Sequence, residues 1–190
     1  MTLGFDNAVK DLYKIPKVLD VGAGGLDGHN TTKSLHKYFG YANVTCMQIK
    51  EAVARDYVSK YPSTIMKEQD FYEYDFKDEK FDLIVLDLNI DNNINRDWQG
   101  DGLKKAHSIL NPKGIVVCYI CHDNSASPAA SDYMYLEDLI QKHLDGFWGG
   151  SVVDEKIKSV IKEKFPMYKL VSINDDVERD NITWIALQKV

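Results

Sequence analysis

A strand, a glycine-rich turn and the start of a helix follow one another near the beginning of the chain. The mostly apolar run 17–21 reads KVLDV, the turn 22–25 reads GAGG, and the polar group 30–32 then opens a helical pattern. Glycines in such a turn let the backbone approach a ligand where a Cβ would collide. The following helix points its first N–H groups and the positive end of its dipole toward the same place. This succession predicts the first unit of a doubly wound α/β sheet.

The spacing of the glycines distinguishes two kinds of nucleotide site. A turn that binds a dinucleotide carries the pattern G-x-G-x-x-G. Gly22 and Gly24 fit its first two positions, but the third position is Asp27, and Gly28 comes one residue late. An acid, Asp20, instead stands two residues before the first glycine. The turn therefore has the pattern D-x-G-x-G.

The D-x-G-x-G pattern resembles the first motif of the class I S-adenosylmethionine-dependent methyltransferases, which lies at the end of the first strand. Two further segments resemble the same family in the same order. The apolar run 81–87 reads FDLIVLD and ends in an acid, and the segment 110–117 reads LNPKGIVV. The latter is similar to the L-x-P-G-G-x-L turn before strand five, with Lys113 in place of one glycine.

Hydrophobic period and turn residues predict alternating strands and helices. Strands are expected at 17–21, 43–48, 64–67, 81–89, 115–121, 167–173 and 182–187. Helices are expected at 5–13, 30–39, 50–60, 99–110 and 152–164. The polar connection 174–181 makes the last two strands a hairpin. The resemblance then implies a Rossmann-like, doubly wound, seven-stranded α/β sheet of order 3-2-1-4-5-7-6, with strand seven antiparallel, in three α/β/α layers.

The domain organisation is expected to be simple. A chain of 190 residues suits a single domain with a sizeable core. The resemblance covers residues 5–190 and leaves the segment 122–150 unmatched. This segment follows strand five at the ligand edge, and we expect it to be an insertion on the substrate side that covers the acceptor.

Composition and charge exclude several classes of protein. Hydrophobic residues make up 44% of the chain and charged residues 27%, as in a globular, ordered protein. The net charge of −6 argues against a broad contact surface for nucleic acid or an anionic membrane. No apolar run approaches the ~20 residues that span a bilayer, and no basic-apolar leader opens the chain, so we expect a cytoplasmic protein.

The three cysteines are interpreted as buried, small apolar residues. Cys46, Cys118 and Cys121 all lie in apolar, strand-like runs. Cys118 and Cys121 form a C-x-x-C pattern, but residues three apart on a strand point to opposite faces. We therefore expect no metal site.

The resemblance implies S-adenosylmethionine as the cofactor. The turn would hold its amino-acid part, Gln48 its ribose, and Asp70 with Phe71 its adenine. The family usually places Asp or Glu at the position of Gln48, because a carboxylate accepts hydrogen bonds from both ribose hydroxyls, whereas an amide accepts one and donates another. The residues implied to bind the cofactor are Asp20, Gly22, Ala23, Gly24, Gln48, Ile49, Asp70, Phe71, Asp87 and Leu88.

The reaction implied by the resemblance is methyl transfer to an oxygen or nitrogen of a small-molecule, sugar or peptide acceptor. Positioning and exclusion of water would supply most of the rate. An oxygen acceptor of high pKa also needs a base, and the candidates at the predicted ligand edge are His122 and Asp87. The residues expected to bind the acceptor are His29, Asn89, Trp98 and Tyr133.

Two other functions stay open at this point. A degenerate, methyltransferase-like binding subunit is suggested by Gln48 and by the lack of an obvious catalytic base. An NADP-dependent oxidoreductase is suggested by the neutral Gln48 followed by Lys50, since a cation there suits a 2′-phosphate. The glycine spacing and the terminal hairpin weigh against the oxidoreductase.

Overall fold

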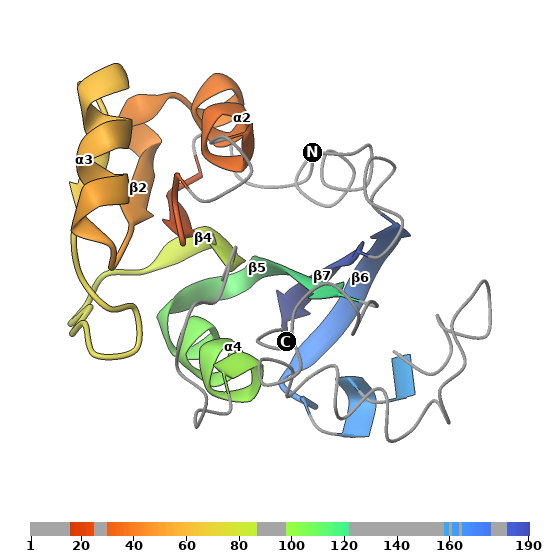
Figure 1. Cartoon of the computed structure of the whole chain (residues 1–190). Coiled ribbons are helices and arrows are strands. Elements are labelled where there is room, and N and C mark those ends of the chain that lie inside the picture. Colours follow the sequence, from red (N-terminus) through yellow and green to blue (C-terminus); the bar gives the residue numbers. More distant parts are fainter. Residues whose placement is uncertain are drawn as a thin grey trace.

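The computed structural model describes residues 16–24, 30–86, 98–121, 158–159, 161–163, 165–175 and 182–190. Within them, helices flank one mixed sheet (Figure 1). The strands are β1 (Val18–Val21), β2 (Val44–Met47), β3 (Ile65–Lys67), β4 (Phe81–Leu86), β5 (Leu110–Cys121), β6 (Tyr168–Asp175) and β7 (Ile182–Lys189). The helices are α2 (Asn30–Phe39), the short 3₁₀ helix η1 (Tyr41–Asn43), α3 (Glu51–Lys60) and α4 (Trp98–Ile109).

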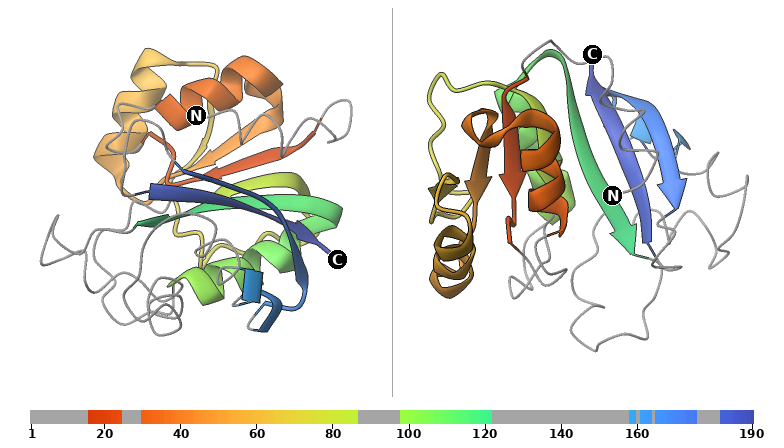
Figure 2. Two further views of the ribbon diagram at one scale, coloured as in Figure 1. Left: turned by 90° about the vertical axis from the view of Figure 1, so that its right-hand side faces the viewer. Right: turned by 90° about the horizontal axis from the view of Figure 1, so that it is seen from above.

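The strand order confirms the predicted fold class. The seven strands follow the order β3-β2-β1-β4-β5-β7-β6. The first five run parallel to one another, and β7 is antiparallel to both of its neighbours. The strands fan across the sheet with the twist that side-chain sterics impose (Figure 2). The chain is therefore a Rossmann-like α/β domain with a reversed strand near one edge.

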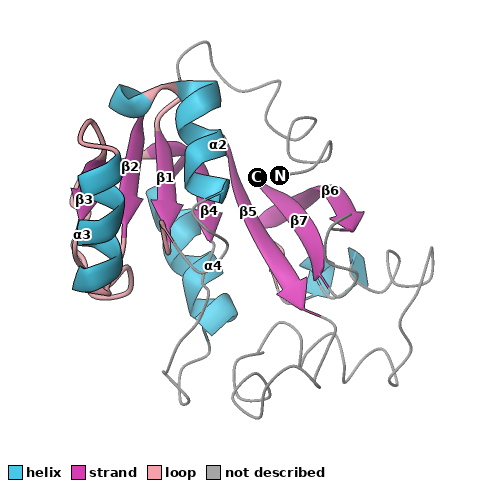
Figure 3. Cartoon of the chain, turned by 45° about the horizontal axis from the view of Figure 1, so that its top comes forward, coloured by secondary structure: helices cyan, strands magenta, loops and turns pink. Residues whose placement is uncertain are grey.

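The apolar side chains of the sheet divide between its two faces. On β4, Leu83 and Val85 belong to the same core cluster as Leu35 of α2, whereas Ile84 belongs to the cluster that includes Leu103 of α4. Helices α2 and α3 cover one face and α4 covers the other (Figure 3). Because both faces are covered, β1, β2 and β4 are buried along their whole length.

Most predicted bounds differ from the observed ones by one or two residues, and one correction is larger. Strand β5 begins at Leu110 rather than at 115. It is already paired with β4 before the turn residues, and the register then shifts between Phe81 and Leu83. The predicted helix 5–13 and the insertion 122–150 lie outside the described residues. Of the predicted helix 152–164, the described residues are helical. In the described part of the chain, no helix has the length and apolar character needed to cross a membrane.

The turn at residues 111–114, within β5, places two neighbouring residues under opposite constraints. Lys113 has a φ of 64°, in the left-handed region that disfavours any residue with a Cβ. Gly114 has no room for a side chain, because a Cβ there would lie 2.9 Å from the carbonyl oxygen of Asn111 and 3.2 Å from that of Phe81.

Substitutions in this turn should therefore change stability in opposite directions. Gly114→Ala should lower the free energy of unfolding by about 1–3 kcal/mol through overpacking against backbone. Lys113→Gly should raise it by about 0.5 kcal/mol, because relief of the left-handed backbone exceeds the entropy that glycine adds to the unfolded chain. Urea unfolding of the two variants measures both effects, and a less stable Lys113→Gly variant would contradict the argument.

Candidate functional site

The strand register brings the predicted cofactor-binding segments to one edge of the sheet. Val21 pairs with both Met47 and Leu86, and Met47 pairs in turn with Lys67. These four strands are parallel, so the residues that follow them emerge together at the carboxyl edge. This is the edge at which open α/β sheets bind their ligands.

The described part of the glycine turn is bonded to the protein through its N–H groups. The N–H groups of Gly22 and Ala23 both donate to the carbonyl oxygen of Met47, at 3.0 and 3.1 Å. The N–H group of Gly24 donates to the Thr32 hydroxyl on α2 at 3.0 Å. Gly22 and Gly24 adopt positive φ values of 86° and 75°, which only glycine adopts without strain. The turn is thus held between β2 and α2, with its N–H groups directed into the protein.

Gln48 joins the end of β2 to this turn. Its Nε2 donates to the carbonyl oxygen of Ala23 at 2.9 Å, and its Oε1 accepts the backbone N–H of Lys50 at 3.0 Å. Its backbone N–H donates to the carbonyl oxygen of Lys67 at 3.1 Å. Gln48 is 8% exposed, whereas the side chain of its neighbour Ile49 is an exposed apolar group at the same edge.

A buried polar cluster adjoins the acid of the first motif. Asp20 is fully buried and pairs in register with Cys46. His36 of α2 lies between Cys46, with Nε2 to Sγ at 3.7 Å, and Tyr57 of α3, with Nδ1 to Oη at 3.2 Å. The Tyr41 ring lies 4.1 Å from the His36 ring, centroid to centroid. Burial and the negative charge of Asp20 raise the pKa of the Cys46 thiol, so Cys46 is a protonated, buried residue, as predicted.

The buried His36 should make stability depend on pH. Burial lowers the pKa of His36 below its ordinary 6.5, and its facing groups Tyr41, Tyr57 and Cys46 carry no compensating charge. The unfolded chain therefore takes up a proton as the pH falls through about 6.5 while the folded chain does not, and stability falls by up to about 1.4 kcal/mol per pH unit.

Urea unfolding between pH 7 and pH 5 checks this expectation. His36→Gln should reduce the loss of stability on acidification. Burial lowers the pKa of His107 as well, so His107→Gln serves as the comparison for a half-buried histidine. An unchanged pH dependence of stability in His36→Gln would show that His36 is not its cause.

The predicted adenine-binding residues lie on the loop after β3. Asp70 accepts the N–H of Tyr72 at 2.7 Å through Oδ1. Phe71 is 3% exposed and packs edge-on against Phe76, with ring centroids 5.9 Å apart. Lys105 of α4 lies over the Phe71 ring at 5.7 Å and donates to the Tyr72 carbonyl oxygen at 2.6 Å. The structure thus places the ring of Phe71 in the core and leaves Asp70 half-buried on the loop.

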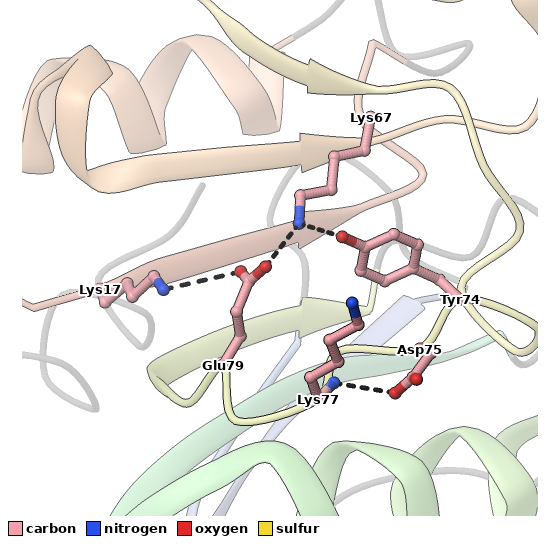
Figure 4. A network of polar contacts seen from close by, with 6 residues as sticks. All are labelled: Lys17, Lys67, Tyr74, Asp75, Lys77 and Glu79. Carbon is pink, nitrogen blue, oxygen red and sulfur yellow. Dashed lines mark hydrogen bonds and ion pairs between the residues drawn. The ribbon is translucent and has the colours of Figure 1, made fainter.

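A network of polar contacts fixes the rest of this loop (Figure 4). Lys67 donates to the hydroxyl of Tyr74 at 2.7 Å and to Glu79 at 3.0 Å, and Lys17 lies 3.6 Å from the other oxygen of Glu79. Burial alone would lower the pKa of Lys67, but these hydrogen bonds raise it, and the bond from Lys67 lowers the pKa of Glu79. The loop also forms a surface hollow of about 490 Å³, lined by Gln69, Asp70, Glu73, Tyr74, Asp75 and Lys77.

The acceptor side of the predicted site is not part of the described structure. Trp98 is the first residue of α4, but the position of its side chain is not described. The other predicted residues that lie outside the described ranges are His29, Asp87, Leu88, Asn89, His122 and Tyr133. Their roles therefore stay predictions.

Two residues of this region were missed by the interpretation of the sequence. Thr32 anchors Gly24 through its hydroxyl, and His36 is a buried polar residue, 5% exposed. A threonine in the first turn of the helix after a glycine loop is a usable signal for the role of Thr32. No local signal indicates the burial of His36, because its hydrogen-bond partners come from β2 and α3.

Comparison with known proteins places this geometry in a family. The profile of the methyltransferase domain family matches residues 18–114, just over half of the chain. No curated protein sequence matches significantly. The match spans the glycine turn, the end of β2, the loop after β3 and the turn within β5.

Several solved methyltransferases have similar structures at low sequence identity. A Methanosarcina mazei S-adenosylmethionine-dependent methyltransferase is 12% identical, with a TM-score of 0.62 and 95% of each chain covered. The glycopeptide N-methyltransferase MtfA, solved with S-adenosyl-L-homocysteine, is 9% identical, with a TM-score of 0.61 over 97% of this chain and 90% of that one. A TehB-like S-adenosylmethionine-dependent methyltransferase from Corynebacterium glutamicum is 16% identical, with a TM-score of 0.56 over 98% and 88%. The chain belongs to the methyltransferase domain family and has the class I S-adenosylmethionine-dependent methyltransferase fold.

Proposed function

We propose that the chain binds S-adenosylmethionine and transfers its methyl group to an oxygen or nitrogen of a small-molecule, sugar or peptide acceptor. The observation that carries the choice of cofactor is the direction of the N–H groups in the described part of the turn, residues 22–24. A dinucleotide requires free N–H donors for its pyrophosphate. Here the N–H groups of Gly22, Ala23 and Gly24 donate within the protein, which supports a ligand that is cationic at this end, as the ammonium and sulfonium groups of S-adenosylmethionine are.

The described residues fit such a cofactor. Asp20 supplies a buried negative charge beside the turn, and the N–H groups of Gly22, Ala23 and Gly24 are already bonded within the protein. Ile49 presents an exposed apolar side chain next to Gln48, suited to cover an adenosyl group. We assign the adenine amine to Asp70. When bound, S-adenosylmethionine supplies an electrophilic methyl group, and the protein's part is to orient it and to exclude water.

The acceptor side is proposed from the sequence and from the neighbours. Asp87 and Leu88 directly follow β4, where donor and acceptor would meet, and His122 directly follows β5. We propose His122 with Asp87 as the base for an oxygen acceptor. The set proposed to bind the acceptor is His29, Asn89, Trp98 and Tyr133. MtfA, named as a glycopeptide N-methyltransferase, makes a nitrogen of a peptide-like acceptor one class to test.

Calorimetric titration tests the cofactor assignment. The wild-type chain should bind S-adenosylmethionine and S-adenosylhomocysteine and should not bind NADP. Asp20→Asn should weaken binding of S-adenosylmethionine by about tenfold, because the attraction of a buried negative charge beside the turn, worth about 1.4 kcal/mol, is lost. Asp82→Asn is the matched control, since Asp82 is also a buried acid but lies at the amino edge of the sheet. Binding of NADP alone would overturn the proposal.

A second measurement separates an enzyme from a binding subunit. The chain should release S-adenosylhomocysteine from S-adenosylmethionine when supplied with a panel of amine, hydroxyl and peptide acceptors. Deleting the segment 122–150 should abolish this turnover and leave cofactor binding intact if the segment covers the acceptor. Loss of both would contradict that role, and binding without turnover across the panel would support a degenerate subunit.

A further inference from the structure

Gln48 is tied into the protein through both ends of its amide group. The bond from Nε2 to the carbonyl oxygen of Ala23, at 2.9 Å, spans from the end of β2 to the glycine turn after β1. The bond from the N–H of Lys50 to Oε1, at 3.0 Å, orients the residue that precedes α3. At 8% exposure, Gln48 has little access to water that could replace either bond. One side chain thus connects the turn, β2 and the start of α3.

A carboxylate at position 48 cannot make the first of these bonds. An amide nitrogen donates hydrogen bonds, whereas an ionised carboxylate only accepts them. A carboxylate oxygen in place of Nε2 would lie against the carbonyl oxygen of Ala23, with like partial charges in contact. The acid usual in the resembled family accepts bonds from ribose. In this chain the same position has to donate a bond to the turn, so the two roles demand opposite chemistry.

We infer that Gln48 is a positioning residue that sets the conformation of the turn 22–24, and that the ribose part of the cofactor site is therefore neutral. The identity of the ligand rests on the proposed function, whereas the positioning role of Gln48 rests on its two hydrogen bonds alone. Among the described residues, one N–H and one lone pair of the amide are not used by these two bonds, so the amide could offer a ribose one donor and one acceptor and no charge. Restoring the family's acid should then weaken cofactor binding instead of strengthening it.

Gln48→Glu, titrated with S-adenosylhomocysteine, tests the inference because the pH switches the bonding character of the introduced group. At about pH 8 the group is an ionised acceptor, and the affinity should fall about tenfold or more below wild type. At about pH 5.5 the buried carboxyl group is protonated, because burial and the facing carbonyl raise its pKa. Its O–H can then donate to Ala23, and the affinity should recover toward that of wild type at the same pH.

Two variants serve as controls. Gln48→Met removes both bonds without adding charge, and its loss of affinity should be the same at both pH values. Gln188→Glu makes the identical change in another glutamine whose Nε2 donates to a backbone carbonyl oxygen, that of Lys113 at 3.1 Å. Gln188 is paired with Ile115, whose partner Leu83 lies near the start of β4, at the amino edge. Gln188→Glu should bind S-adenosylhomocysteine as wild type does.

The outcomes separate the inference from the proposed function. Binding by Gln48→Glu at about pH 8 that equals or exceeds wild type would overturn the inference, and so would a loss that does not recover on acidification. If wild type binds no S-adenosylhomocysteine, the proposed function fails, and the Tm values of the Gln48 variants then test the positioning role of Gln48. Gln48→Glu should then melt below Gln48→Met at about pH 8 and above it at about pH 5.5. The same order of the two Tm values at both pH values would overturn the positioning role of Gln48.

Discussion

Replacing Asp82 with alanine is expected to lower the free energy of unfolding by about 3 kcal/mol, because two charge-assisted hydrogen bonds are lost. Asp82 is 7% exposed and lies at the start of β4. Its Oδ2 accepts the backbone N–H of Lys17 at 2.8 Å, and its Oδ1 accepts the Nδ2 of Asn111 at 2.7 Å. Asp82 therefore binds both the residue that precedes β1 and the turn within β5 at the amino edge of the sheet. Urea unfolding at neutral pH measures the loss.

The size of the effect should depend on burial and on the number of acceptors. Asp82→Asn keeps one acceptor oxygen and should lose less stability than Asp82→Ala. Asp78→Ala removes an exposed carboxylate, and such surface substitutions usually change stability by less than about 0.5 kcal/mol. If Asp82→Ala were no more destabilising than Asp78→Ala, the carboxylate could not stabilise the sheet edge as described.

Replacing Tyr57 with alanine is expected to lower the free energy of unfolding by about 4 kcal/mol through the cavity that it leaves. Tyr57 is among the largest fully buried side chains and connects α3 to α2 through its contact with His36. Tyr57→Phe keeps the ring and loses the hydroxyl contact to His36, so it should lower stability by about 1 kcal/mol. Urea unfolding of both variants separates packing from hydrogen bonding.

An aromatic residue on the neighbouring helix provides the control for Tyr57. Tyr38 of α2 is 56% exposed, and Tyr38→Ala should change stability by about 0.5 kcal/mol or less. A similar loss in Tyr38→Ala and Tyr57→Ala would show that ring size, and not burial, determines the effect. That result would contradict the packing described for α3.

The fold could be predicted from the sequence because its signals are local and repeated. Buried parallel strands such as β4 form continuous apolar runs, and the helix expected at 30–39 has those bounds in the structure. The order of the strands followed from the resemblance together with the terminal hairpin, which a polar connection before Ile182 indicated. The early start of β5 was missed because pairing with β4 continues across a turn sequence.

The candidate site was harder to predict because its chemistry depends on partners distant in the sequence. The sequence shows that the residue at position 48 is neutral, but only the fold brings its amide to the carbonyl oxygen of Ala23. Phe71, which stays predicted to lie against the adenine ring, also contacts Phe76 and Lys105 of α4, and no local pattern indicates these contacts. Such assignments need the tertiary structure, since no spacing rule states which face of a loop is buried.

The hydrogen bonds of the turn also bear on the thermodynamics of ligand binding. The backbone at 22–24 is already fixed by Met47, Thr32 and Gln48 when the chain has folded. A preorganised loop loses little conformational entropy when a ligand arrives, so little of the intrinsic affinity is lost to ordering. In this segment the free and liganded protein should share one backbone conformation, and their amide exchange rates should differ little.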